Sequence, residues 1–236
     1  MEAKVLNLNT LSIKSIIDIL NDDGICKIKN NKNMSIEEFR TFCKRFLTIV
    51  KLIPNDPEVV RISKDHYLSR IYLPWHPEGS WVEDDIISAS YNYLNCEKFP
   101  TEFINTNEIF NDYCDDINYY KKIKVKLKDS GRFKWNKNNN KKEINVIEKR
   151  NQKYYLYINP QYTDEIINDN KSLYKNLIKK FWDREDEIEK YKFTAEVEKN
   201  DIIIYHNVKI IHTRPKNLKN VSFDRELWRV TGTINV

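Results

Sequence analysis

The chain has 236 residues, of which 40% are hydrophobic and 32% are charged, and its formal net charge is +5. This length and composition predict a single globular domain over residues 1–236, with a sizeable buried core. Neither a membrane protein nor an exported one is expected, because no apolar run approaches the roughly 20 residues that span a bilayer and the N-terminus lacks a secretory pattern.

The cysteines and the basic residues add further limits. Cys26, Cys43, Cys96 and Cys114 form no CxxC pair, which predicts reduced thiols in a cytoplasmic protein. The 40 basic residues are interleaved with 35 acidic ones, and the densest basic tract is "KWNKNNNKK" at 134–142. A solvated loop is the favoured interpretation of this tract, and a contact with a nucleic acid backbone is the weaker alternative. The oligomeric state stays open.

The first part of the chain predicts helices alternating with strands. The segment "SIKSIIDILNDDGICKIKN" predicts a short amphipathic helix, a turn at Asp23-Gly24 and a strand. In "MSIEEFRTFCKRFLTIV", Ser35 is expected to cap a helix that carries Phe39, Phe42 and Phe46 at helical spacing.

Short strands dominate beyond Pro54. They are expected in "VVRIS", "SRIYL", "IISASYNYL" and "TEFINT", before a helix over "TNEIFNDYCDDI" that is capped by Thr106 or Asn107. Further strands are expected in "KIKVKL", "INVIEK", "KYYLYIN", "FTAEVEKNDIIIYHN", "KIIHTRP" and "ELWRVTGTINV", with a helix from about Asn170 to Trp182 between them. This order favours a mainly β (α+β) fold with a sandwich or barrel core and flanking helices.

A histidine and a carboxylate lie two positions apart in "YLPWHPEGSW". On an extended segment, His76 and Glu78 would point to the same side. Such a pair is more often packed or exposed than metal-binding, so a third ligand is required. A distal histidine, His206 or His212, could complete a set of two imidazoles and one carboxylate. That set binds one face of an octahedral ion and is typical of non-haem Fe(II) oxygenases.

Two arginines follow near the end of the chain, in "FDRELWRV". Arg225 and Arg229 are four residues apart, so they face the same side of a strand. A guanidinium is suited to bidentate binding of a carboxylate. The alternative is a surface pair with Glu226 as the partner.

Taken in order, these segments resemble the taurine dioxygenase-like (TauD/TfdA) family of Fe(II)- and 2-oxoglutarate-dependent oxygenases. The pattern is closest to the clavaminate synthase-like branch, in which the carboxylate ligand is glutamate. The resemblance covers most of the chain and is specific as an ordered set, which is "GICKIKN", "MSIEEFRTFCKRF", "WHPEGSW", "FPTEFINTNEIF", "KYYLYINPQYTDEI", "NDIIIYHNVKIIHTRP" and "RELWR". It implies a double-stranded β-helix (jelly-roll, cupin-like) core with flanking helices.

The resemblance also implies the roles of individual residues. His76, Glu78 and His212 would be the iron ligands, and His206 would be structural. Arg225, 13 residues after His212, would bind the distal carboxylate of 2-oxoglutarate with support from Thr101. Arg229 would bind an anionic group of the substrate. Separately from the resemblance, Trp81, Tyr72 and Trp75 are candidates for the pocket wall, and the alternative is that these aromatic residues belong to the core, which is the more common case at such spacings.

Two departures from the family pattern are visible. Lys98, Phe99 and Pro100 replace the usual glycines before Thr101. The chain is also short, so the substrate-covering lid, expected within 125–165, would be reduced or differently built.

The expected function is that of a dioxygenase that hydroxylates an unactivated C–H bond and releases succinate and CO₂. Its cofactor and cosubstrates would be Fe(II), 2-oxoglutarate and O₂. Its substrate would be a small carboxylate-bearing molecule such as a free amino acid or a derivative. The alternatives are the same chemistry on a sulfonate or another small anion, on a protein or on a nucleic acid, and a non-catalytic jelly-roll binding protein.

Overall fold

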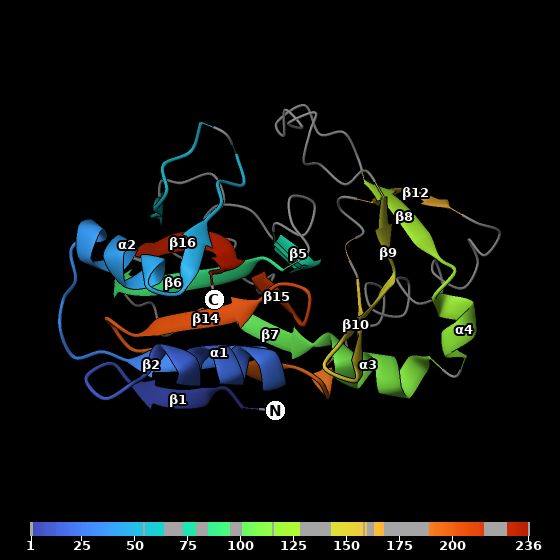
Figure 1. Ribbon diagram of the computed structural model, residues 1–236, viewed down its shortest axis with the longest axis horizontal. Helices are drawn as coiled ribbons and strands as arrows, with labels where there is room; N and C mark the ends of the chain where they lie inside the picture. Colours follow the sequence, from blue (N-terminus) through green and yellow to red (C-terminus); the bar gives the residue numbers. More distant parts are fainter. Residues whose placement is uncertain are drawn as a thin grey trace.

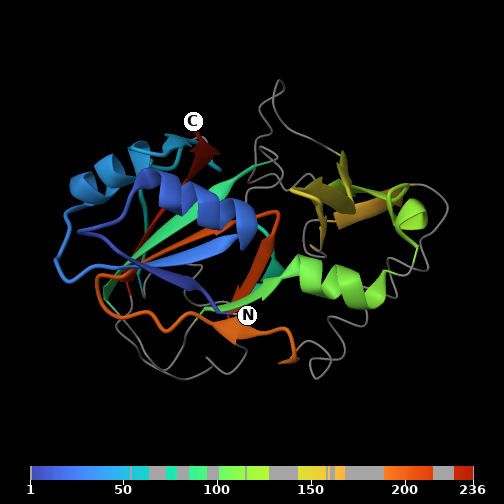
Figure 2. The same cartoon turned by 60° about the horizontal axis from the view of Figure 1, so that its bottom comes forward.

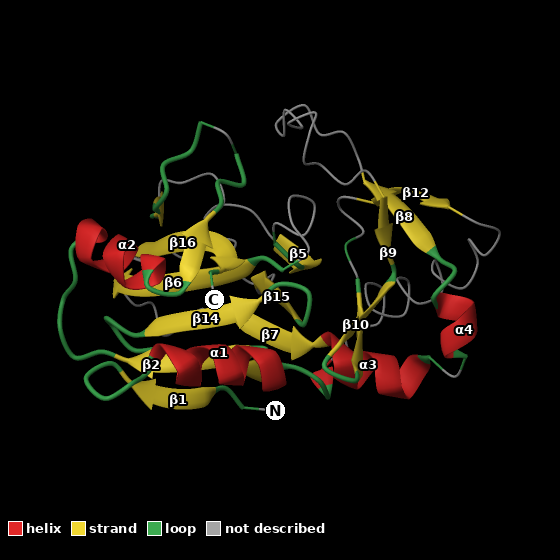
Figure 3. Ribbon diagram, viewed as in Figure 1, coloured by secondary structure: helices red, strands yellow, loops and turns green. Residues whose placement is uncertain are grey.

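The computed structural model of the protein describes two packed β-sheets and a smaller lobe beside them (Figure 1). The described residues are 2–53, 55–63, 73–78, 85–94, 101–114, 116–127, 143–157, 159, 163–167, 189–214 and 226–235. Strands make up most of both parts, and the helices lie at their flanks (Figure 3).

The larger sheet has seven strands in the order β1-β2-β14-β6-β16-β3, and β4 also pairs with β16. Its strands are β1 (Lys4–Asn7), β2 (Ile25–Lys29), β3 (Leu47–Ile49), β4 (Val60–Ile62), β6 (Ile87–Leu94), β14 (Ile202–His206) and β16 (Glu226–Ile234). The pair β1–β2 is parallel and the other pairs are antiparallel.

The smaller sheet has the order β13-β7-β15-β5, and all its pairs are antiparallel. Its strands are β5 (Leu73–His76), β7 (Glu102–Asn105), β13 (Phe193–Thr194) and β15 (Ile210–Arg214). Ile25 and Ile203 of the larger sheet share one buried cluster with Phe103 and Ile210 of the smaller sheet. The two sheets therefore enclose a common core, as in a jelly roll.

The central strand β14 shows why its apolar run is continuous. Ile203 and Tyr205 belong to the core between the sheets, whereas Ile202 and Ile204 belong to the core under the helices. Because successive side chains of a strand point to opposite faces, both faces of β14 must be apolar.

Two capped helices cover the outer face of the larger sheet (Figure 2). Helix α1 (Ile13–Asp22) begins where the Ser12 hydroxyl accepts a hydrogen bond from the amide of Ser15. Helix α2 (Ile36–Lys44) begins with a capping box between Ser35 and Glu38. Both helices bury their apolar side in one cluster with the larger sheet.

The smaller lobe is inserted between β7 and β13. It contains α3 (Thr106–Tyr113), α4 (Ile117–Tyr120), β8 (Lys124–Leu127), β9 (Glu143–Asn145), β10 (Ile147–Arg150), β11 (Lys153–Leu156) and β12 (Thr163–Ile167). Its hydrophobic cluster also includes Trp75, Ile104 and Ile211 of the smaller sheet. The lobe is thus packed against the strands that carry the candidate histidines.

The mainly β jelly-roll architecture confirms the predicted fold class. The Ser35 cap is confirmed, but Phe46 lies beyond α2, where it is still fully buried. The predicted caps Thr106 and Asn107 are wrong, because Asn105 is the N-cap and its side chain accepts from the amide of Asn107. Asn105 is also the last residue of β7, so the strand leads directly into the helix.

Other differences concern element boundaries and coverage. The single helix predicted over 106–117 is split into α3 and α4, and strands β1, β3 and β12 were not predicted. The helix expected over 170–182 lies outside the described residues, as does the strand expected in "SRIYL" except for its last residue, Leu73, which begins β5. Cys26 and Cys43 are free and buried, Cys114 is buried, and Cys96 lies outside the described residues. No helix in the described part of the chain combines the length and apolarity needed to cross a bilayer.

Gly232 on β16 provides a test of the sheet packing. A Cβ at this position would lie 2.4 Å from the backbone oxygen of Thr48 and 3.1 Å from Cβ of Leu47. Because the oxygen belongs to the neighbouring strand, the β16–β3 ladder would have to open. Gly232→Ala should lower the free energy of unfolding by about 1–3 kcal/mol, as measured by urea denaturation. Thr233→Ala serves as the control on the same strand, and an equal loss in both variants would contradict this account.

Candidate functional site

Two histidines meet on adjacent strands of the smaller sheet. His76, the last residue of β5, is the cross-strand partner of His212 on β15. Their ring centroids are 4.4 Å apart, and both side chains are buried. Pro77 follows His76 and has no backbone N–H to donate, so it cannot extend the β5 ladder. The chain can then turn and bring the next residue toward the same site.

Glu78 joins the two histidines. Its Oε2 lies 3.9 Å from Nε2 of His212, and its side chain is buried. The structure therefore brings together the three residues that the sequence suggested as iron ligands.

Arg229 reaches this group from the opposite sheet. It lies on β16, and its guanidinium donates a hydrogen bond to Oε2 of Glu78. The two side chains are only 13% and 11% exposed, respectively. A carboxylate at such a depth needs a cationic partner, and here the guanidinium of Arg229 provides it.

Aromatic rings surround His212. The Tyr205 ring centroid is 5.1 Å from that of His212, and the Phe103 centroid is 6.5 Å from it. Both rings come from the core between the sheets. Trp75, which was expected in the pocket wall, belongs instead to the hydrophobic cluster of the smaller lobe. Successive side chains of β5 point to opposite faces, which separates Trp75 from His76.

The donor set is suited to a divalent transition metal, because two imidazoles and one carboxylate satisfy a borderline ion in a facial arrangement. As they stand, however, no three histidine, cysteine, aspartate or glutamate side chains within the described ranges form a metal-binding group. Oxygen Oε2 of Glu78 is directed to Arg229. Metal binding would therefore require this carboxylate to turn toward the histidines.

For the remaining predicted site residues, the structure gives less information. Thr101 directly precedes β7, whose first residue, Glu102, is the cross-strand partner of Thr213. Thr101 is thus adjacent to the sheet that carries His212, and its role stays a prediction. Arg225, Trp81 and Tyr72 lie outside the described residues.

Asn207 is a site residue that the sequence did not single out. Its Oδ1 accepts a hydrogen bond of 3.0 Å from the backbone amide of Glu78. Its Nδ2 donates to the carbonyl of Ile86 and to the hydroxyl of Ser88. The position next to His206 in a turn was visible in the sequence, but a contact with a residue 129 positions away was not.

The turn that carries Asn207 is held by buried polar groups. Nε2 of His206 lies 3.4 Å from Oδ1 of Asp85, and its Nδ1 accepts from the amide of Val208. Burial lowers the pKa of His206, and the hydrogen bond to Asp85 partly opposes this effect. Burial also lowers the pKa of Lys209 to about 8. These contacts agree with the expected structural role of His206.

The sequence matches no family pattern and no curated protein. Solved structures do resemble it. A candidate alpha-ketoglutarate-dependent taurine dioxygenase from Burkholderia xenovorans has a TM-score of 0.73 and 16% identity, with 99% of this chain and 90% of that chain covered.

Two further structures extend the comparison. PvcB, an Fe, alpha-ketoglutarate dependent oxygenase from an isonitrile synthetic pathway, has a TM-score of 0.68 and 13% identity, over 96% of this chain and 81% of PvcB. AAD-2, solved with Mn(II) and N-oxalylglycine, has a TM-score of 0.71 and 12% identity, over 100% of this chain and 97% of AAD-2. The chain therefore has the jelly-roll fold of the taurine dioxygenase-like, alpha-ketoglutarate-dependent oxygenases.

Proposed function

We propose that this protein is an Fe(II)- and 2-oxoglutarate-dependent dioxygenase that hydroxylates a small carboxylate-bearing substrate of the free amino acid class. The observation that carries this proposal is the convergence of His76, Glu78 and His212 at a buried position between the two sheets. Fold alone would not support an activity, because one fold hosts many functions. The activity is inferred instead from the two imidazoles and the carboxylate and from their closeness to one another.

The solved structures support the same class. PvcB is an Fe, alpha-ketoglutarate dependent oxygenase, and AAD-2 was solved with Mn(II). A Glu-type carboxylate ligand also favours hydroxylation, desaturation or cyclisation over halogenation, because halogenases of this superfamily have a small residue there. With Glu78 present, no position is left free for a halide in that place.

In the mechanism, His76, Glu78 and His212 would hold Fe(II). When bound, the iron with 2-oxoglutarate and O₂ supplies the oxidation of a substrate C–H bond, with release of succinate and CO₂. The protein residues position the reactants and limit water. Tyr205 and Phe103 shield His212 on the core side. By the family resemblance, Arg225 would hold the distal carboxylate of 2-oxoglutarate, with Thr101 as support.

Arg229 has two successive roles in this proposal. Without metal, its guanidinium is the counter-ion of Glu78. With Glu78 engaged as a metal ligand, the guanidinium of Arg229 would be free to bind an anionic group of the substrate. A carboxylate fits this position, and a sulfonate or another small anion offers similar chemistry.

Metal binding tests the proposal first. The protein should bind one Mn(II) per chain, and Glu78→Ala should weaken binding and abolish succinate release, because one ligand and one negative charge are lost. Electron paramagnetic resonance of free Mn(II) measures the affinity. Glu165→Ala, which removes an exposed carboxylate in the smaller lobe, is the matched control. Unchanged Mn(II) binding and turnover in the Glu78 variant would show that Glu78 is not a ligand.

Substitutions of the two arginines should have different kinetic effects. Arg225→Ala should raise the KM for 2-oxoglutarate by a factor of hundreds, because losing one partner of a buried ion pair costs about 3–5 kcal/mol. Arg229→Gln should leave this KM nearly unchanged and bind Mn(II) at least as tightly as the parent protein, since a cation that competes for Glu78 is gone. It should instead lose the stimulation of succinate release by the prime substrate, measured across a panel of amino acids. An unchanged KM in the Arg225 variant would make Arg229 the better candidate for the 2-oxoglutarate clamp.

A further inference from the structure

We infer that Asn207 is a positioning residue that holds the backbone of Glu78 in place, so that the Glu78 carboxylate meets His76 and His212. The inference rests on the proposed function in one respect, namely that Glu78 is a metal ligand. Asn207 would not contact the metal itself, and it would influence metal binding through the position of Glu78.

The side-chain amide of Asn207 has a defined orientation. Its side chain is fully buried, with Oδ1 3.0 Å from the backbone nitrogen of Glu78. Its Nδ2 lies 3.0 Å from the Ile86 carbonyl and 2.9 Å from the Ser88 hydroxyl. A backbone N–H can only donate and a carbonyl can only accept, so a flipped amide would break two bonds at once. The side chain thus joins the ligand segment to the start of β6.

The β14–β15 turn, which contains Asn207, is anchored independently of the ligand segment. The backbone N–H of Asn207 donates to the Ile86 carbonyl, and the backbone N–H of His206 donates to the Gly24 carbonyl. Nζ of Lys209 donates to the carbonyls of Leu20 and Asn21 at the end of α1. A fixed turn can therefore impose its position on Glu78.

The turn approaches Gly24 closely. Gly24 has a φ of +81°, and a Cβ there would lie 2.9 Å from Cβ of Lys209. A glycine at this position allows both the left-handed backbone and the short distance. The end of α1, the Gly24 turn and the β14–β15 turn therefore form one packed support for Asn207.

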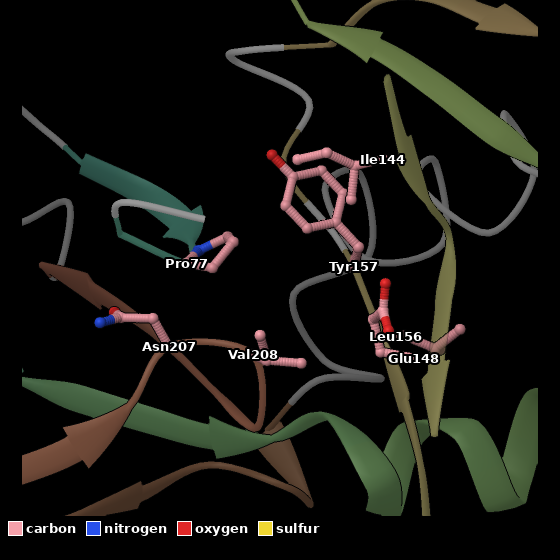
Figure 4. A pocket seen from close by; sticks show the side chains of 7 residues that line it. All are labelled: Pro77, Ile144, Glu148, Leu156, Tyr157, Asn207 and Val208. Carbon is pink, nitrogen blue, oxygen red and sulfur yellow. The ribbon is translucent and has the colours of Figure 1, made fainter. Parts of the chain in front are cut away.

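A pocket lies beside the ligand segment. It separates Pro77, Asn207 and Val208 of the jelly roll from Ile144, Glu148, Leu156 and Tyr157 of the smaller lobe (Figure 4). Pro77 itself has no backbone N–H that could anchor the segment. The hydrogen bond from Glu78 to Asn207 is therefore well placed to restrain the segment.

Removing this hydrogen bond should affect the metal more than it affects folding. Partners that orient a ligand typically contribute 10–100-fold to metal affinity. We expect Asn207→Ala to weaken Mn(II) binding by about 10–100-fold at a temperature where the variant is fully folded. Ser88→Ala is the matched control, because it removes one partner of the same amide and leaves the contact with Glu78 intact. It should lower the melting temperature and leave Mn(II) affinity close to that of the parent protein.

A spectroscopic readout separates positioning from a loss of stability. Saturated with Co(II), Asn207→Ala should show an absorption spectrum altered in the same direction as that of Glu78→Ala, because both variants misplace or remove the carboxylate ligand. Ser88→Ala should reproduce the parent spectrum. An Asn207→Ala variant with parent-like Mn(II) affinity and Co(II) spectrum would overturn the inference. A parent protein that binds neither ion would instead overturn the proposed function.

One measurement needs no variant. In the parent protein, amide hydrogen exchange at Glu78, followed by nuclear magnetic resonance, should be as slow as exchange at Asn207, because both amides are held in the same buried network. Rapid exchange at Glu78 would overturn the inference even if Asn207→Ala did not fold.

Discussion

The Glu78 carboxylate is a negative charge buried between two β-sheets, and the site is arranged around it. His212, whose ring lies against that of His76, and the Arg229 guanidinium both approach its Oε2 atom. Taking this carboxylate out of water is costly unless a cation compensates its charge. The same demand makes the position suitable for a divalent metal. We propose that Arg229 compensates the charge of Glu78 when no metal is bound, and that the metal does so when it is bound.

The jelly roll meets this requirement by joining distant parts of the chain. The smaller sheet contributes both histidines, the larger sheet contributes Arg229, and the β14–β15 turn fixes the backbone of Glu78 through Asn207. The smaller lobe packs on the smaller sheet through Trp75, behind the same strand that carries His76. Rigid strands hold the side chains more accurately than a free loop would.

Local patterns predicted much of this arrangement. The N-cap at Ser35 and the Asp23-Gly24 turn follow from short-range rules. The two-residue spacing drew attention to His76 and Glu78, although Glu78 lies beyond the end of β5 and not on an extended strand. Contacts between distant segments could not be derived in this way. The pairing of Arg229 with Glu78 and the hydrogen bond from Glu78 to Asn207 depend on how the two sheets face each other, and no single segment encodes that geometry.

Anomalous scattering from a Mn(II)-loaded crystal would locate the metal relative to the three proposed ligands. One strong Mn(II) peak is expected within bonding distance of His76, Glu78 and His212, with the Glu78 carboxylate turned away from Arg229. A peak elsewhere in the molecule would contradict this expectation. So would an unoccupied site, at saturating Mn(II), in which Glu78 still accepts its hydrogen bond from Arg229.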